Sequence, residues 1–262
     1  MPLRISIGPA LPSRTRRASC RLRIGSLIGA FLARVSSPGY GAWGGIGNLV
    51  RSAALGFFIA AAGLTGSAAA EPVKLLAFGD SLTAGYGLPP DQGFVPQLQA
   101  WLEAHGTAVV VQNGGVSGDT SSGGLSRINW ALGDGAQAMI LTLGGNDLLR
   151  GIAPEVTRDN LDAILARTDA ERIPVLLVPM VAPGNYGNDY KIAFDAIYAD
   201  LAARHRALLA RPFLSAILDQ PDRATALARY VQDDGLHPTA EGVALIVDRI
   251  GPQVQELLAK VK

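Results

Sequence analysis

The chain has very little cysteine and histidine. Cys20 is the only cysteine among 262 residues, so the sequence from residue 71 onward carries no thiol. This absence excludes disulfides, a cysteine nucleophile and cysteine-ligated zinc from that part of the chain. With only three histidines, few positions can supply a neutral base or a metal ligand. We therefore expect neither a metal nor a cofactor.

Acidic residues are absent from the first 70 positions, which carry eight arginines. Residues 71–262 carry 15 Lys and Arg against 22 Asp and Glu, a net charge of −7. A segment with this negative net charge offers no stripe of basic side chains. Proteins that bind nucleic acids need such a stripe, because its charges replace the counterions of the phosphate backbone. The composition therefore argues against a nucleic-acid partner, and it divides the chain into two parts with different roles.

The end of the basic part is typical of a secretory signal. Arg51 precedes about twelve apolar residues at positions 53–64, a run that suits a signal peptide and is too short to span a bilayer. Ala68 and Ala70 supply the small side chains of a cleavage site. We predict a signal peptide over 50–70, cleavage near Ala70, and a mature protein in the periplasm or outside the cell.

Residues 1–49 are rich in Arg, Gly and Ser, and we expect them to be poorly structured. Signal peptides seldom follow such a leader, so our hypothesis is that translation starts near Val50 and that the leader is not made. An uncleaved N-terminal anchor is the alternative, which the short apolar run disfavours. For the mature protein we expect no stable membrane span.

From residue 73 the sequence alternates short apolar runs with longer segments of helical spacing. Runs this apolar, bounded by Gly, Asp, Asn or Pro, indicate parallel strands that are covered on both faces. We predict an α/β fold, a three-layer α/β/α sandwich with a mainly parallel five-stranded sheet, as one domain over 71–262. The expected strands are 73–78, 108–113, 136–143 and 174–180, with a weaker fifth at 207–213.

Polar segments follow the first three predicted strands. They are "GDS" at 79–81, "GGVSGDTS" at 114–121 and "GGND" at 144–147. Because ligands of open parallel sheets bind beyond the carboxyl ends of the strands, these segments are expected to share one rim. Each segment alone would also fit an ordinary turn or helix cap.

A fourth segment, "DDGLHP", precedes the C-terminal helical pattern. Asp234 lies three residues before His237, and in a turn this spacing lets the carboxylate hold Nδ1 and leaves Nε2 free to take a proton. His105 and His205 have no such partner in the sequence, and we interpret both as surface side chains without a functional role.

These four segments, in this order, resemble the SGNH hydrolase superfamily, also called GDSL esterases and lipases. The resemblance covers essentially all of residues 73–262. It implies a flavodoxin-like order of the five strands, a catalytic triad of Ser81, Asp234 and His237, and an oxyanion hole formed by Ser81, Gly118 and Asn146.

The chemistry agrees with these roles. A serine hydroxyl is a weak nucleophile without an adjacent base, so Ser81 would depend on His237, whose tautomer Asp234 would fix. Four other carboxylates near these segments are interpreted as turn or capping residues. They are Asp80, Asp119, Asp147 and Asp233.

The exact sequences of the segments "GDSLTAGYG" and "LGGNDLLRG" resemble those of a bacterial subgroup of this family. Its members are periplasmic arylesterases that also act as acyl-CoA thioesterases and lysophospholipases. This implies a serine esterase for small-molecule aryl and short-to-medium acyl esters, with acyl thioesters and lysophospholipids as further substrates. Asn185 and Tyr186 would line an acyl pocket, although Tyr186 fits an ordinary loop aromatic equally well. The alternatives are a carbohydrate or peptidoglycan O-acetylesterase and a catalytically silent α/β binding module.

Overall fold

The structure, a computed structural model, describes residues 71–261. The predicted leader over 1–49 and the signal peptide over 50–70, with its cleavage site near Ala70, lie outside the described residues. None of the helices in 71–261 is both long enough and apolar enough to cross a bilayer.

Five strands form one parallel sheet in the order β2-β1-β3-β4-β5. The prediction of a five-stranded, flavodoxin-like sheet is confirmed. In this strand order β2 lies on one side of β1, and the later strands are added on the other side, so the order switches between β1 and β3. The strands are β1 Val73–Gly79, β2 Val109–Gly115, β3 Ala138–Thr142, β4 Val175–Leu177 and β5 Leu208–Leu209.

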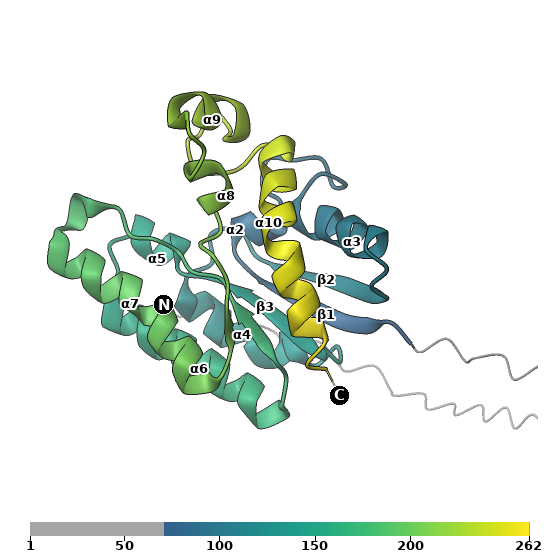
Figure 1. The fold of residues 1–262 in the computed structure, drawn as a ribbon. Coiled ribbons are helices and arrows are strands. Elements are labelled where there is room, and N and C mark those ends of the chain that lie inside the picture. Colours follow the sequence, from purple (N-terminus) through teal and green to yellow (C-terminus); the bar gives the residue numbers. More distant parts are fainter. Residues whose placement is uncertain (1–70, 262) are drawn as a thin grey trace, which may run out of the picture. The chain divides into compact units, whose positions relative to one another are not determined.

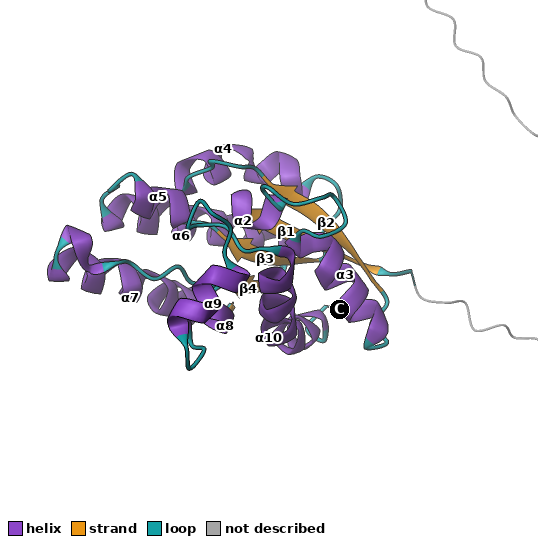
Figure 2. Cartoon of the chain, turned by 90° about the horizontal axis from the view of Figure 1, so that it is seen from above, coloured by secondary structure: helices purple, strands orange, loops and turns teal. Residues whose placement is uncertain are grey.

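Helices cover both faces of this sheet, which gives the three predicted layers (Figures 1 and 2). α3 and α10 pack together on one face, and α4, α6 and α7 pack in a row on the other. The helices are α2 Ser81–Ala84, α3 Phe94–Ala104, α4 Ser121–Leu132, α5 Gly145–Leu149, α6 Pro154–Glu171, the 3-10 turn η2 Gly184–Tyr186, α7 Asn188–His205, α8 Ser215–Leu218, α9 Arg223–Tyr230 and α10 Ala240–Leu258.

The central strands are apolar because both of their faces are covered. Every residue of β3 and β4 is buried, and β1 is buried from Leu75 onward. β2 differs, because it is the edge strand beyond β1: of its residues only Val109 is buried, and Val110 is 45% exposed. The prediction that residues 108–113 are covered on both faces is therefore wrong.

Two strands are shorter than their apolar runs. Residues 174–180 give only the three residues of β4, because Pro174 and Pro179 flank it and have no N–H to donate to a neighbouring strand. Residues 207–213 give only the two residues of β5. The carboxyl ends of the central strands nevertheless meet at one rim, where the predicted functional residues follow them.

α10 anchors the segment that carries His237. Its apolar residues between Val243 and Val254 recur every three or four positions and are buried, as expected for an amphipathic helix. Thr239 caps the helix by accepting from the Gly242 N–H at 3.2 Å. The histidine therefore stands two residues ahead of Thr239, the cap of a firmly packed helix.

Candidate active site

Ser81 stands where the chain leaves β1 and enters α2. β1 ends at Gly79, and a Cβ at that position would collide with the Thr83 side chain. Asp80 caps α2 by accepting from the Leu82 N–H at 3.0 Å. The tight turn through Gly-Asp-Ser therefore makes Ser81 the first residue of the helix, at the rim where the strands end.

A chain of hydrogen bonds joins Ser81, His237 and Asp234. The Ser81 Oγ lies 2.8 Å from the His237 Nε2, although 156 positions separate the two residues. The His237 Nδ1 lies 2.5 Å from the Asp234 Oδ2. Because a carboxylate only accepts hydrogen bonds, the proton belongs on Nδ1, and Nε2 is left to accept from the serine hydroxyl.

The turn around Asp234 keeps its carboxylate charged. Its Oδ1 accepts from the His237 N–H at 3.0 Å and from the Leu236 N–H at 2.9 Å. The backbone bond from His237, followed by its imidazole and the Leu236 N–H, lowers the pKa of Asp234 to about 2. The carboxylate that meets the imidazole thus belongs to Asp234 and not to the neighbouring Asp233.

Gly118 lies in the loop after β2 and lines the same cavity as Ser81 and His237. Its φ of +83° is in the left-handed region that favours glycine. Its carbonyl oxygen accepts from an Arg150 guanidinium nitrogen at 2.8 Å, which holds this loop against the end of α5. The Arg150 contact therefore holds the Gly118 carbonyl in place at the wall of the cavity.

Asn146 lies in the first turn of α5 and also lines the cavity. Its Nδ2 donates to the Asp80 Oδ2 at 3.3 Å. Asp80 is 2% exposed, and this burial raises its pKa to about 6 even though bonds from Leu82 and Asn146 act in the opposite direction. The predicted capping role of Asp80 is confirmed, but sequence reasoning missed its contact with Asn146.

The cavity has a volume of about 780 Å³, within the range of small-molecule sites. Its walls are largely apolar and come from α5, the loop after β4 and the segment around α8. They include Leu148, Leu149, Met180, Val181, Phe213 and Leu214. Within residues 71–261, no three His, Cys, Asp or Glu side chains are grouped so that they would hold a metal ion.

Both predicted substrate residues, Asn185 and Tyr186, lie in η2 and line the cavity. The Tyr186 ring lies 5.0 Å from the Tyr190 ring, and a Cβ at Gly151 would lie 3.2 Å from it. Tyr186 remains 42% exposed. One side of this ring is therefore packed while the rest faces the cavity and solvent.

Sequence reasoning missed Arg127, which ties two strand ends together beneath the site. This α4 side chain donates to the Gly79 carbonyl at 2.9 Å, to the Gly114 carbonyl at 2.8 Å and to the Asp119 carboxylate at 2.6 Å. Its guanidinium carbon also lies 4.0 Å from the centre of the Phe78 ring. Asp119 thus acts as the partner of a half-buried arginine in addition to lying in a turn.

Tyr86 is a second residue that sequence reasoning missed. Its ring centre lies 4.6 Å from that of the His237 imidazole, and its side chain lines the cavity while remaining 54% exposed. The signal for it was an aromatic residue between two glycines directly after the serine motif.

Asp147 is completely buried beneath the rim. Its carboxylate accepts from the Ser121 N–H at 2.8 Å, the Ser121 hydroxyl at 2.5 Å and the Thr157 hydroxyl at 3.0 Å. These partners belong to α4 and α6. The predicted capping role is correct in kind, but Asp147 serves neighbouring helices instead of its own.

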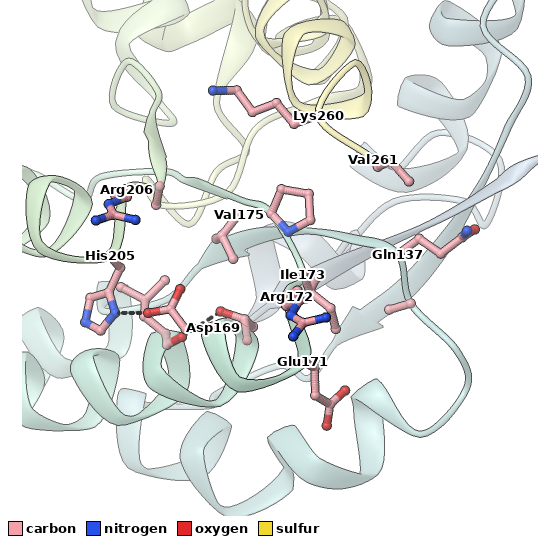
Figure 3. A pocket seen from close by; sticks show the side chains of 15 residues that line it. Gln137, Asp169, Glu171, Arg172, Ile173, Val175, His205, Arg206, Lys260 and Val261 are labelled. Carbon is pink, nitrogen blue, oxygen red and sulfur yellow. Dashed lines mark hydrogen bonds and ion pairs between the residues drawn. The ribbon is translucent and has the colours of Figure 1, made fainter.

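The other two histidines lie away from this cavity. His105 is exposed and stacks on Trp101, as expected of a surface side chain. His205 lines a second cavity of about 660 Å³ near the amino ends of the strands (Figure 3). Its side chain is 8% exposed, with Nδ1 2.6 Å from Asp169 and Nε2 2.7 Å from Asp162. The surface interpretation of His205 is therefore wrong, because two carboxylates of α6 enclose it.

A parallel sheet of this order, with a serine, an imidazole and a carboxylate joined at its carboxyl rim, is typical of a serine hydrolase. Residues 77–245 match the GDSL-like lipase/acylhydrolase family, and the chain belongs to that family. The resemblance drawn from the four sequence segments is thereby confirmed.

Individual relatives agree with this assignment. The chain is 36% identical to the Escherichia coli (strain K12) protein named thioesterase 1/protease 1/lysophospholipase L1, over 72% of this chain and 87% of that protein. It is 34% identical to an arylesterase of Vibrio mimicus, over 69% and 88% of the two chains. The crystal structure of AlinE4, an SGNH-hydrolase family esterase, superposes with a TM-score of 0.58 at 42% identity, over 72% of this chain and 97% of that one. The protein is therefore an enzyme, a carboxylic ester hydrolase that acts on small-molecule esters.

Proposed function

We propose that the protein is a serine esterase that forms an acyl-enzyme on Ser81. The observation that carries this proposal is the hydrogen-bonded chain from Asp234 through His237 to Ser81 at the wall of a largely apolar cavity. A hydroxyl within 2.8 Å of an imidazole nitrogen, which is itself oriented by a carboxylate, is the arrangement that activates a serine.

In the first half-reaction His237 Nε2 takes the hydroxyl proton while the Ser81 Oγ attacks the carbonyl carbon, and Asp234 stabilises the imidazolium that forms. The imidazolium then protonates the leaving alcohol or thiol, and the acyl group stays on Ser81. In the second half-reaction the same nitrogen deprotonates water, which attacks the acyl carbon and releases the acid.

Each attack produces a tetrahedral intermediate whose oxygen carries negative charge. We assign its stabilisation to the N–H groups of Ser81 and Gly118 and to the side-chain amide of Asn146, all three at the cavity. A donor of this kind acts mainly in the transition state, and removal of one typically lowers kcat by about 10²–10³.

The substrate class follows from the cavity. Its largely apolar walls suit an aryl group or a short-to-medium acyl chain, since each buried methylene contributes about 0.8 kcal/mol to binding. The relatives named arylesterase and thioesterase/lysophospholipase support aryl esters first, with acyl thioesters and lysophospholipids as further substrates. Asn185 and Tyr186 would contact the acyl or aryl group from η2. An O-acetylesterase for glycans is disfavoured, because sugar hydroxyls would need more polar partners than these walls provide.

We further propose that the mature enzyme begins after Ala70 and works in the periplasm or outside the cell. The apolar run at 53–64 and the small residues before position 71 support this export. N-terminal sequencing of the exported protein tests it: a start near residue 71 is expected, and retention of the apolar run would favour the anchor instead.

The nucleophile is tested with a fluorophosphonate probe and with Ser81→Ala. We expect the probe to label the wild type at Ser81, and the variant to lose labelling and at least about 10⁴-fold in kcat, because no other group can form the acyl-enzyme. Ser126→Ala is the matched control, since this α4 hydroxyl is exposed and bonds only to the Gly123 carbonyl. A Ser81→Ala enzyme that keeps more than a few per cent of its activity would overturn the assignment.

A substrate panel tests the specificity. p-Nitrophenyl esters from acetate to palmitate, a set of acyl-CoA thioesters and an acetylated glycan are compared by kcat/KM. We expect kcat/KM to rise from acetate toward butyrate and octanoate, with weaker hydrolysis of the glycan. A preference for the acetylated glycan over all the other esters would favour the O-acetylesterase.

A further inference from the structure

Asp80 lies beside the nucleophile, but the proposed mechanism gives it no role. It is 2% exposed, and both oxygens of its carboxylate are engaged. Oδ1 accepts from the Leu82 N–H at 3.0 Å, and Oδ2 accepts from the Asn146 Nδ2 at 3.3 Å. A Cβ at Gly145 would lie 3.2 Å from the same Oδ2, so the α5 backbone also closes in on this oxygen.

The contact with Asn146 matters because the asparagine side chain has two orientations of nearly equal shape. One presents the NH₂ group to the oxyanion, and the other, rotated by half a turn, presents the carbonyl oxygen. Only the first stabilises negative charge, and the second repels it. An oxyanion hole that relies on an asparagine therefore needs something that selects between the two.

An ionised carboxylate makes this selection, because it accepts hydrogen bonds and cannot donate them. We propose that Asp80 is a positioning residue that turns the NH₂ group of Asn146 toward the oxyanion. One amide hydrogen is bound to the Asp80 Oδ2, and the other is left for the substrate oxygen. This inference rests on the proposed function, since it presumes that Asn146 is an oxyanion donor.

The charge state of Asp80 permits this role under ordinary assay conditions. Burial raises the pKa of Asp80 to about 6, so the group is ionised at about pH 8 and acts there as a pure acceptor. The positive charge of His237, when its imidazole is protonated, lowers the pKa of Asp80 and so favours the charged form of this carboxylate. The variants are therefore assayed at about pH 8.

Asp80→Asn is predicted to reverse the selection. The Leu82 N–H still requires an acceptor at 3.0 Å, so the carbonyl oxygen of the new side chain takes the place of Oδ1. Its NH₂ group then faces Asn146, whose amide rotates to offer its carbonyl oxygen in return. In this variant the oxyanion hole presents an acceptor where it previously presented a donor.

Asp80→Ala removes the selection without reversing it. The Asn146 amide is then free to take either orientation, and the oxyanion itself can select the productive one. The same variant loses the cap of α2, which typically lowers stability measurably. Asp80→Asn keeps the cap and removes a charge that burial disfavours.

The expected result is that the effects on kcat and on melting temperature fall in opposite orders. We expect kcat to fall about 10²-fold or more in Asp80→Asn and about 10-fold in Asp80→Ala, with KM changed less than about threefold. The melting temperature should fall in Asp80→Ala and stay level or rise in Asp80→Asn. If Asp80 had a purely structural role, Asp80→Ala would have both the lower kcat and the lower melting temperature of the two variants. That outcome would overturn the proposal. Asp233→Asn is the matched control, because the Asp233 carboxylate is exposed and lies outside the site.

A double-mutant cycle with Asn146→Ala separates this inference from the proposed function. In the Asn146→Ala background we expect Asp80→Asn to change kcat by less than about threefold, because the amide it would misorient is gone. If both single losses multiply instead, Asp80 acts independently of Asn146 and the inference fails while the esterase mechanism stands. If Asn146→Ala alone leaves kcat unchanged, the oxyanion assignment within the proposed function is wrong, and the inference falls with it.

Discussion

Two histidines in this molecule each have a carboxylate on Nδ1, at opposite ends of one sheet, yet their second partners differ. His237 has Asp234 on Nδ1 and the Ser81 hydroxyl on Nε2, at the carboxyl rim. His205 has Asp169 on Nδ1 and Asp162 on Nε2, in the second cavity near the amino ends of the strands. The nearest carboxylate alone therefore does not distinguish a catalytic histidine from a structural one.

The second partner decides what each ring can do. A hydroxyl can give up its proton, so the ring nitrogen beside it can act as a base. A carboxylate has no proton to give, so a ring between two carboxylates is stabilised with both nitrogens protonated. Burial lowers the pKa of His205, but the hydrogen bonds to Asp169 and Asp162 outweigh it and raise the pKa above its ordinary value. His205 is thus a clamp between α6 and α7 whose charged form the two carboxylates favour, whereas His237 is the base that we propose.

Replacing each histidine in turn gives the largest expected contrast. His237→Gln should lower kcat/KM for p-nitrophenyl butyrate by at least about 10³-fold, because glutamine cannot accept the serine proton. His205→Gln should change it by less than about threefold, since this ring lies away from the substrate cavity. Comparable losses in the two variants would break the distinction drawn between the two sites.

The carboxylates give the next largest contrast. Asp234→Asn should lower kcat by about 10²–10⁴-fold, because an amide can stabilise the wrong imidazole tautomer and no longer stabilises the imidazolium. Asp169→Asn makes the same chemical change beside His205 and should leave kcat within about threefold. Asp233→Asn should also be silent, and a kcat loss there larger than that of Asp234→Asn would show that the spacing argument selected the wrong aspartate.

Residues of the proposed catalytic site could be predicted because local patterns mark them. Ser81, Gly118 and Asn146 each follow an apolar run that forms a strand, and Asp234 lies three residues ahead of His237. In each case the signal spans fewer than about ten residues, a range over which turn chemistry and hydrophobic periodicity act.

The remaining features depend on which elements pack together, and no local pattern reveals that. The His205 clamp requires α6 and α7 to lie side by side, and the Arg127 contacts require α4 to cross the ends of β1 and β2. The edge position of β2 likewise follows from strand order, so an apolar run that suggested full burial became a half-exposed strand. The partnership of Asp80 with Asn146 joins positions 66 residues apart.

The smallest expected effect concerns stability and tests the charge state of His205. Its pKa is raised in the folded protein, so the stability it contributes is fully present below the unfolded histidine value of about 6.5. That contribution is lost as the pH rises through the raised folded value, because the clamp then loses its positive charge. The clamp should therefore stabilise the fold most in mild acid and least in alkali.

His205→Gln compared with the wild type isolates this contribution, because all other titrating groups are shared. We expect the wild type to melt a few degrees above the variant at about pH 5.5, since about 1 kcal/mol corresponds to roughly 2–4 °C in a protein of this size. The difference should shrink once the pH has risen through the raised pKa of His205, because the imidazole is then neutral and only one of its nitrogens can donate. Calorimetry from about pH 5.5 into the alkaline range measures it. If the difference stayed constant, or grew toward alkaline pH, His205 would be a neutral packing residue, and the contrast between a clamp and a base would rest on His237 alone.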